Sequence, residues 1–475
     1  MLSENLRVRH SLKPLAPACA LLLALPLALG GSRPVRAAGA PPDTLVVLST
    51  TDMKGKTSPC GCHIPKGGFA RIAAFLDSAR AVRRSTLYVD AGGYFPEQDG
   101  RTDLAEFMTR SLVQLGVGAI GVGPRDLRHG IAFLRDLVQR TGAPVTCANL
   151  ADKRTRLPIF TSGRLLDVDG VKVGVFALYS DRFDLGPAAD SLVVLDPENA
   201  AQSQVTALRN KGAQVVLLLA QMGRAGGEDL VSTVPGIDAV VLGHDVPVYE
   251  MGRRIGETMA SYAGEQGQHL GVIKVALAPG GKVADALCSV AALGPDVREQ
   301  PAMFKAVKTF EDAYNERMRV EERSANVNDD DDPVDHFVGE QVCARCHAAE
   351  SQQWRTTAHS LAWETLQRVK KDATPECIPC HVVGFRQAGG FQTDLRTPHL
   401  VNVQCENCHG MGTEHASDWL THHKVNEGTC RTCHNQERDP EFDFAAKYPL
   451  IVHGNTSGES IRIVKARRGS GAMGG

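Results

Sequence analysis

The 475-residue sequence has no excess of charge of either sign, and beyond its N-terminus it has no long hydrophobic run. Its 52 lysines and arginines nearly balance 54 aspartates and glutamates, for a formal net charge of −2. Such a chain offers no general basic surface, so nucleic acid is not expected as a partner. After residue 29 no segment approaches the ~20 apolar residues of a membrane-spanning helix, so no membrane span is expected in the mature chain.

The first 37 residues have the pattern of a secretory signal peptide. Basic residues within the first 13 positions precede an apolar run, residues 15–29, which Pro26 interrupts, and small residues follow at positions 37–40. A short, interrupted run favours cleavage over anchoring in the membrane. We therefore expect residues 1–37 to be removed and the protein to be exported to the bacterial periplasm or beyond.

Four Cys-x-x-Cys-His motifs lie in the last third of the chain. Two thiols at this spacing can bind both vinyl groups of one haem, and the following imidazole can ligate its iron. Zinc sites do not need a histidine directly after every cysteine pair. The motifs predict four covalent c-type haems, attached through Cys343, Cys346, Cys377, Cys380, Cys405, Cys408, Cys430 and Cys433, with His347, His381, His409 and His434 as proximal ligands.

The region around these motifs is poor in aliphatic side chains. Between residues 336 and 454, fewer than one residue in five is Leu, Ile, Val or Phe, a level typical of chains that do not fold by burial alone. All three tryptophans of the chain nevertheless lie here. We expect residues 336–460 to form a mainly α-helical module in which the porphyrins supply the hydrophobic core.

Several residues around the motifs share a pattern with one known family. They are Val338-Gly339-Glu340, Trp354 with His359, Gly384-Phe385, Glu414-His415, and Tyr448-Pro449 with His453. Together with the order of the motifs, they make about 120 residues resemble the tetrahaem cytochrome c-554 family of ammonia-oxidising bacteria. The resemblance implies His359, His415 and His453 as distal ligands.

The spacing of the histidines adds a prediction about which haem His415 serves. It lies six residues after His409, too close to pass around a porphyrin edge and ligate the opposite face of the same iron. We therefore expect His415 to ligate a neighbouring haem. One distal ligand stays open among His399, His422 and His423, because one haem of the family has no sixth ligand.

The N-terminal part, residues 41–295, alternates short apolar runs with amphipathic segments, which is typical of a layered α/β sheet. The sequence predicts strands at 45–48, 86–90, 171–176, 214–220 and 239–242, and helices at 69–84, 103–115, 131–140 and 199–211. Residues 296–335 should contain a connecting helix over 301–323 and an acidic linker. Residues 461–475 are expected to be a flexible tail.

Short motifs within this part carry a second resemblance. They include the segments 48–55, 89–93, 121–126, 148–150, 219–223 and 241–245. Their order and spacing resemble the 5′-nucleotidase branch of the metallophosphoesterases, including the thiosulfohydrolase of bacterial sulfur oxidation. The resemblance implies a four-layered α/β/β/α fold.

The metal ligands of that family are largely replaced here. By comparison with the family pattern, Asp52 and His244 remain, whereas other ligand positions hold Lys54, Gly93, Pro124, Arg125, Gln221 and Val246. Two ligands do not hold the two metals that such hydrolases use, so a divalent metal is not expected. Lys54 and Arg125 would place positive charge in the old metal pocket, where it would suit an anion if both point inward.

Cys60 and Cys62 form a new feature beside that pocket. They lie in the loop after the first predicted strand. They are candidates for binding a soft metal, carrying a sulfur species or acting as a redox pair. The alternative is a disulfide with each other, or with Cys147 or Cys288, although those two are most simply buried structural residues.

We therefore expect an exported tetrahaem cytochrome that transfers electrons to periplasmic or extracellular redox proteins and carries a catalytically altered nucleotidase-like domain. The alternative is a haem-linked oxidoreductase of a sulfur compound or another small molecule, with Cys60, Cys62, Lys54 and Arg125 as candidate catalytic residues. A metal-dependent phosphoester hydrolase is the least favoured function.

Overall fold

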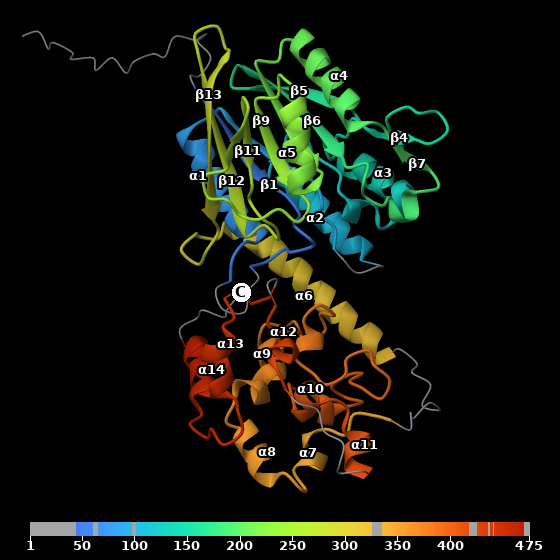
Figure 1. The fold of residues 1–475 in the computed structure, drawn as a ribbon, viewed down its shortest axis with the longest axis vertical. Helices are drawn as coiled ribbons and strands as arrows, with labels where there is room; N and C mark the ends of the chain where they lie inside the picture. Colours follow the sequence, from blue (N-terminus) through green and yellow to red (C-terminus); the bar gives the residue numbers. More distant parts are fainter. Residues whose placement is uncertain are drawn as a thin grey trace, which may run out of the picture. The chain divides into compact units, whose positions relative to one another are not determined.

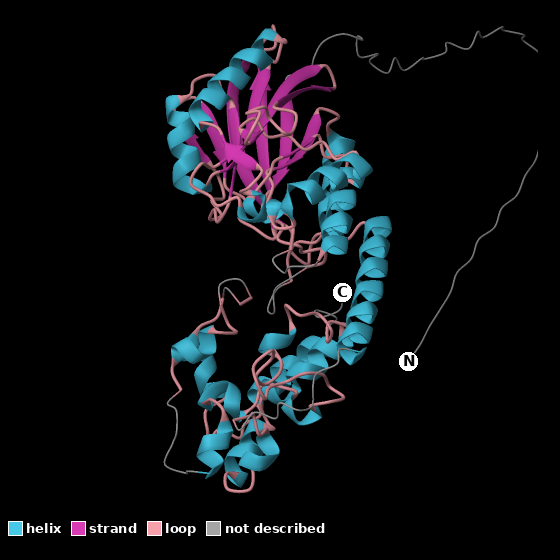
Figure 2. Cartoon of the chain, turned by 90° about the vertical axis from the view of Figure 1, so that its right-hand side faces the viewer, coloured by secondary structure: helices cyan, strands magenta, loops and turns pink. Residues whose placement is uncertain are grey.

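The computed structural model describes residues 44–59, 65–96, 101–324, 335–417, 425–435, 438–439 and 441–469. Residues Pro41–Gly475 cluster as one compact unit. All described strands lie before residue 293, and the described residues from 335 onward are helices, turns and loops (Figures 1 and 2).

Two large β-sheets form the centre of the N-terminal part. The first has the order β13-β12-β1-β2-β3, and the second β10-β11-β9-β8-β6-β5. The strands of the first sheet are β1 (Thr44–Thr50), β2 (Thr86–Asp90), β3 (Ala119–Ile120), β12 (His269–Leu277) and β13 (Val283–Ala292). Those of the second are β5 (Gly163–Val168), β6 (Val171–Tyr179), β8 (Val215–Gln221), β9 (Ala239–Gly243), β10 (Arg253–Ile255) and β11 (Thr258–Ser261). A small third sheet pairs β4 (Leu150–Asp152) with β7 (Leu192–Val194).

The alternation of side chains along β8 shows why the sheets stack. Val215, Leu217 and Leu219 join a buried cluster with residues of the first sheet. Their neighbours Val216 and Leu218 point to the other face and join a cluster with helices. Because successive side chains of a strand point to opposite faces, an uninterrupted apolar run indicates a strand that is covered on both sides.

Helices cover the outer face of each large sheet. Buried residues of α1 (Phe69–Val82), α2 (Thr102–Gln114) and α3 (Gly130–Thr141) share a core with the first sheet. Buried residues of α4 (Pro197–Asn210) and α5 (Gly223–Thr233) share a core with the second. The order helices, sheet, sheet, helices confirms the predicted four-layered α/β fold (Figure 2).

The predicted connecting helix is α6, Pro301–Ser324. Met303 and Val307 are buried in the core of the first sheet and its helices. Phe310 stacks on Phe107 of α2, with ring centroids 4.1 Å apart. The helical spacing of these apolar positions therefore reports the face by which α6 packs on the N-terminal part.

The C-terminal part consists of short helices. These are α7 (Glu340–Cys343), α8 (Ala348–Trp354), α9 (Ala362–Arg368), α10 (Cys405–His409), α11 (Gly412–Ser417), α12 (Glu427–Arg431), α13 (Phe444–Lys447) and α14 (Glu459–Gly469), with 3-10 turns η3 (Ala358–Leu361), η4 (Ile378–Cys380), η5 (Pro398–Leu400) and η6 (Tyr448–Leu450). Among the described residues, its buried apolar cluster has only eight members, Phe337, Trp363, Leu366, Ile378, Val382, Val383, Phe391 and Leu400. This small core agrees with a module that packs around prosthetic groups.

Helix α14 corrects the expectation of a flexible tail from residue 461, since residues 459–469 are helical. The buried Ser460 hydroxyl accepts a hydrogen bond from the Ala358 N–H at 3.1 Å. Ile463 and Val464 line a large cavity. The segment is therefore ordered by docking rather than by its own helix propensity. Residues 470–475 lie outside the described residues.

In the part of the chain that the structure describes, no helix combines the length and apolar character needed to cross a bilayer.

Candidate haem centres and the altered N-terminal pocket

Six of the predicted iron ligands meet as three histidine pairs. The ring centroids are 6.1 Å apart for His347 and His415, 6.0 Å for His409 and His453, and 6.3 Å for His359 and His434. A metal–imidazole bond is about 2 Å long and a ring centre lies about 1 Å behind its bonded nitrogen, so imidazoles on opposite faces of one iron have centres about 6 Å apart. The three pairs therefore have the spacing that a haem iron needs.

The pairing crosses the sequence. His415 of α11 lies beside His347, the histidine of the first motif, and not beside His409, which agrees with the spacing argument. His453 serves the third motif in the same way, and His359 serves the fourth. Segments far apart in the chain thus supply the two faces of each candidate centre. Ligation itself stays a prediction.

Hydrogen bonds hold three of the candidate imidazoles by Nδ1, which leaves their Nε2 for a metal. His381 Nδ1 lies 2.6 Å from the carbonyl oxygen of Ala362. His434 Nδ1 lies 2.8 Å from Asp439 Oδ2. His453 Nδ1 lies 3.3 Å from Gln353 Oε1. Nothing in the sequence around these histidines marks the three acceptors, so the sequence alone does not predict them.

Burial keeps two of the candidate ligand histidines neutral. The pKa of His359 is lowered to about 4, first by burial and then by the nearby His434 and His381. Burial also lowers the pKa of His381. Because only a neutral imidazole has a free nitrogen lone pair, both side chains are in the ligating state at neutral pH.

The second motif differs from the other three. No other imidazole is described near the ring of His381 at the distance of the three pairs. Of the candidates for its partner, His399 is exposed and lies against Gly339, beside the first motif. His422 and His423 lie outside the described residues. The fourth distal ligand therefore stays open.

The thiols show how the motifs are ordered in space. Cys343 and Cys405 lie within hydrogen-bonding reach of one another, as do Cys380 and Cys433. Burial raises the pKa of the Cys408 thiol, and Cys430 and Cys433 lie close enough for their charges to raise it further. In space the four motifs therefore lie in the order second, fourth, third and first.

A large cavity lies among these motifs. Its volume is about 1560 Å³, larger than the ~300–1,000 Å³ of an ordinary small-molecule site. Its lining includes His359, His381, His434 and the thiol-bearing Cys377, Cys380, Cys408, Cys430 and Cys433. Size, thiols and imidazoles together fit c-type haem.

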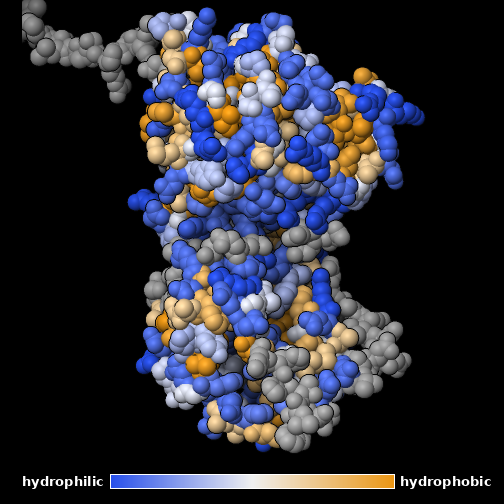
Figure 3. Space-filling view, viewed as in Figure 1, coloured by the Kyte–Doolittle hydropathy of each residue, from blue (hydrophilic) through white to orange (hydrophobic). Residues whose placement is uncertain are grey.

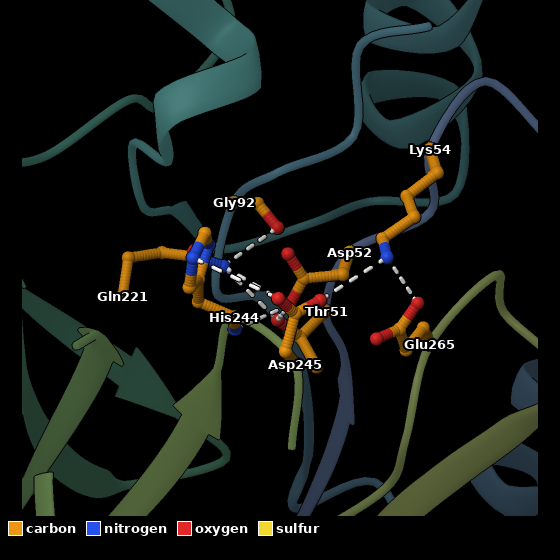
Figure 4. A network of polar contacts seen from close by, with 8 residues as sticks. All are labelled: Thr51, Asp52, Lys54, Gly92, Gln221, His244, Asp245 and Glu265. Atoms are coloured by element: carbon orange, nitrogen blue, oxygen red, sulfur yellow. Dashed lines mark hydrogen bonds and ion pairs between the residues drawn. The ribbon is translucent and has the colours of Figure 1, made fainter. Parts of the chain in front are cut away.

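The old metal pocket of the N-terminal part lies where β1, β2, β8 and β9 end (Figure 4). Loops at the carboxyl ends of parallel strands are the usual place for a functional site. Asp52, Lys54, His244 and Asp245 all have left-handed backbone angles, with φ between 49° and 73°. Such angles in residues other than glycine cluster at functional sites, so the backbone of this pocket is a candidate for one.

Gln221 fills the centre of this pocket. Its Nε2 lies 3.3 Å from Asp52 Oδ2, 3.1 Å from Thr51 Oγ1 and 3.0 Å from the carbonyl oxygen of Gly92. The Asp52 carboxylate also accepts hydrogen bonds from the Thr51 hydroxyl at 2.6 Å and the His244 N–H at 2.7 Å. Burial raises the pKa of Asp52 although these bonds oppose the shift. The hydrogen-bonding capacity of Asp52, one of the two ligand residues of the family that remain, is therefore satisfied by protein groups.

Lys54 brings a cation to the same pocket (Figure 4). Its Nζ pairs with Glu265 and, at 3.4 Å, with Asp245. Burial works against the charged form of Lys54, but the two carboxylates raise its pKa overall. The ammonium group thus supplies internally the positive charge that a metal would supply, and it also lines the same large cavity as Arg125.

These donors do not fit a dinuclear metal centre. A Cβ at Gly93, the position of the family's bridging aspartate, would lie 2.3 Å from Asp52 Oδ1. Within the described ranges no group of three or more His, Cys, Asp or Glu side chains is arranged to hold a metal ion. Arg125, in η1 (Pro124–Leu127), lines the large cavity together with Lys54 and lies close enough for its charge to oppose the raised pKa of Lys54.

The remaining cysteines separate into two kinds. Cys147 and Cys288 are buried free thiols, as expected for structural residues. Cys60 and Cys62 lie outside the described residues, although the flanking Ser58, Pro59 and Pro65 line the large cavity.

Comparison with known proteins supports both halves of this description. Residues 342–410 match the family model for cytochrome c554 and c-prime. Cytochrome c-554 of Nitrosomonas europaea is 38% identical over 97 residues, which are 17% of this chain and 41% of that protein. The 2′,3′-cyclic-nucleotide 2′-phosphodiesterase/3′-nucleotidase of Salmonella typhimurium is 24% identical over 239 residues, 43% of this chain and 37% of that protein. The chain thus spans less than half the length of either relative.

The solved structure of the sulfate thiohydrolase SoxB from Thermus thermophilus also resembles this chain. It has a TM-score of 0.52 at 16% identity and covers 58% of this chain and 62% of its own. A likeness at this identity shows the fold alone. The C-terminal part is therefore similar to cytochrome c-554, and the N-terminal part has the 5′-nucleotidase fold, as the two resemblances predicted.

Proposed function

We propose that the protein transfers electrons through four covalent c-type haems and that its nucleotidase-like part no longer hydrolyses phosphoesters. The three histidine pairs at 6.0–6.3 Å carry this proposal, because two imidazole ligands leave an iron no open position for substrate. When bound, the haems supply reversible one-electron chemistry. The chain holds each group by two thiols and orients its ligands through their Nδ1 acceptors. Export would follow from covalent haem attachment, which takes place outside the cytoplasmic membrane.

The number of haems tests this proposal directly. A pyridine haemochrome assay of the purified protein should give four haems per chain. A value below three contradicts the proposal. Single replacements of the second cysteine in each motif, for example Cys346→Ser, should each reduce the haem content by about one, whereas Cys288→Ser should leave it unchanged.

A second function, oxidoreduction of a small molecule at the second motif, is favoured by one observation. Lysines and arginines outnumber aspartates and glutamates in the lining of the cavity that contains His381, and Lys56, Lys371 and Arg438 act on the nearby Cys377 thiol. A ligand at this haem would therefore lie in mainly basic surroundings that suit a small anion or an anionic sulfur compound. The EPR spectrum of the oxidised protein distinguishes the two functions. A high-spin signal from one haem in four favours this second function, and four low-spin haems exclude it.

The candidate thiols can be tested separately. If Cys60 and Cys62 handle a sulfur substrate, replacing both with serine should abolish turnover of that substrate while the haem spectrum stays the same. An unchanged rate would remove both thiols from the mechanism.

A further inference from the structure

One hydrogen bond distinguishes the fourth motif from the others whose partners are described. His434 Nδ1 lies 2.8 Å from a carboxylate oxygen of Asp439. The corresponding atoms of His381 and His453 face neutral acceptors, a backbone carbonyl and a glutamine amide oxygen. Only the acceptor at His434 therefore carries a full negative charge in this comparison.

Two backbone hydrogen bonds of Asp439 itself hold this residue in place. The Asp439 N–H donates to the carbonyl oxygen of Asn435 at 2.8 Å, and the Asp439 carbonyl accepts from the Phe442 N–H at 3.0 Å. The ring of the buried Phe442 stacks on the His434 imidazole at 4.5 Å and 17°. The side chain of Asp439 is 17% exposed, so water screens the contact only in part.

A carboxylate acceptor changes the donor strength of an imidazole. It attracts the Nδ1 proton, so the ring gains negative character and Nε2 becomes a stronger ligand. Stronger donation stabilises the ferric over the ferrous state and lowers the reduction potential, since hydrogen bonds beyond the ligands are one of the protein's means of tuning a haem.

We propose that Asp439 is a positioning residue that holds the haem of Cys430 and Cys433 at a lower reduction potential than a neutral acceptor would. The inference rests on the proposed function, because it requires that His434 ligate a haem iron. It gives this haem a specific role in the chain of four.

The place of the fourth motif makes this shift consequential. Cys433 adjoins Cys380 of the second motif, and Cys408 of the third motif lies near Cys430 and Cys433. Electrons that move between the second and third haems therefore pass the fourth. A lowered potential there raises the energy of an electron on the fourth haem, relative to the same haem with a neutral acceptor, on the route between the second haem and the pair formed by the third and first.

The test is a spectroelectrochemical titration of the holoprotein with Asp439→Asn. The amide keeps an acceptor for Nδ1 but removes the charge. One of the four midpoint potentials should rise by about the equivalent of a tenfold change in the reduction equilibrium, ~59 mV for one electron. The other three should move much less.

Asp443→Asn is the matched control. Asp443 is an exposed carboxylate in the same loop that caps α13 by accepting from the Ala446 N–H. The Asp443→Asn variant removes an equal charge without touching the imidazole and should leave all four potentials unchanged. Asp439→Glu keeps a carboxylate and should restore the low potential. A shift of equal size in Asp443→Asn would overturn the proposal, and so would unchanged potentials in Asp439→Asn.

Haem content and spin state distinguish a failure of the proposed function from a failure of the tuning role of Asp439. If the wild-type protein holds fewer than three haems, the proposed function fails. If the wild type holds four low-spin haems but Asp439→Asn and Asp439→Gln both lose one, then Asp439 is needed to assemble the site and the tuning role is overturned.

Discussion

Single side chains determine the chemistry of both parts of this protein. In the N-terminal pocket, Gln221 and Lys54 occupy positions at which the resembling hydrolases have metal ligands, and each satisfies acidic groups that would otherwise be exposed to a metal. Around the haem motifs, Asp439, Gln353 and the carbonyl of Ala362 set the orientation of ligand rings. At this scale a hydrogen bond or an ion pair distinguishes one pocket from another.

The ion pair of Lys54 should contribute to stability. Lys54→Ala would leave Glu265 and Asp245 without their cation, and we expect a loss of about 1–3 kcal/mol, the cost of a partly buried charge without a partner. Urea denaturation followed by far-UV circular dichroism measures the effect. Lys282→Ala, at an exposed turn, is the control and should change the midpoint little. Equal midpoints for both variants would contradict the prediction.

Asp90 should make stability depend on pH. Burial raises its pKa to about 8, although hydrogen bonds from the Thr50 hydroxyl and the Gly92 N–H oppose the shift. The folded state keeps a proton that the unfolded chain releases above about pH 4, so this contribution to stability falls as pH rises from about 4 to about 8.

Denaturation midpoints at pH 5 and pH 8 test this dependence. Asp90→Asn mimics the protonated acid and should show a smaller fall between the two pH values than the wild type. Asp229→Asn, on the exposed face of α5, should behave as the wild type does. Equal changes in midpoint between pH 5 and pH 8 for the wild type and Asp90→Asn would rule the prediction out.

Helices and loops bring the iron ligands together. Helix α11 carries His415 to the first motif, and the turn η3 carries His359 to the fourth. Their Cys-x-x-Cys-His partners could be predicted because two thiols and an imidazole are adjacent in the chain. The distal partners could be predicted only through a resemblance, since a lone histidine has no local pattern. Residues 459–469 show the same limit, because α14 is ordered by contacts with η3 rather than by its own sequence.

The pairing of His415 with His347 predicts the effect of one substitution. His415→Ala should convert one low-spin haem to high spin, because the first haem loses its distal ligand, while the haem content stays at four. EPR of the oxidised protein detects the change. His336→Ala is the control, since His336 is exposed and joins none of the three pairs. An unaltered EPR spectrum in His415→Ala would contradict the pairing.

The whole molecule joins two parts that are stabilised in different ways. The N-terminal part has three extensive buried clusters between its layers. The described residues of the C-terminal part have one small cluster, too little apolar area to offset the entropy of ordering such a chain. The haems must therefore supply most of its core.

This difference predicts how the protein behaves without haem. A variant with all eight motif cysteines replaced by serine should keep a folded N-terminal part and an unfolded C-terminal part. Limited proteolysis should then leave a resistant fragment that ends near residue 335, whereas the holoprotein should resist cleavage along its described C-terminal part as well. Equal resistance of both proteins would show that the module folds by itself.

The sequence alone predicted the haem attachment sites and the layered α/β fold, because these depend on residues close together or on a regular alternation along one element. The resemblance to the nucleotidases added that most of their metal-ligand positions hold other residues here. The tertiary structure decided which histidines share a candidate iron, that Lys54 is paired internally, and that Asp439 reaches His434. Those contacts join side chains whose distances depend on how loops and helices pack, and local sequence does not encode such distances.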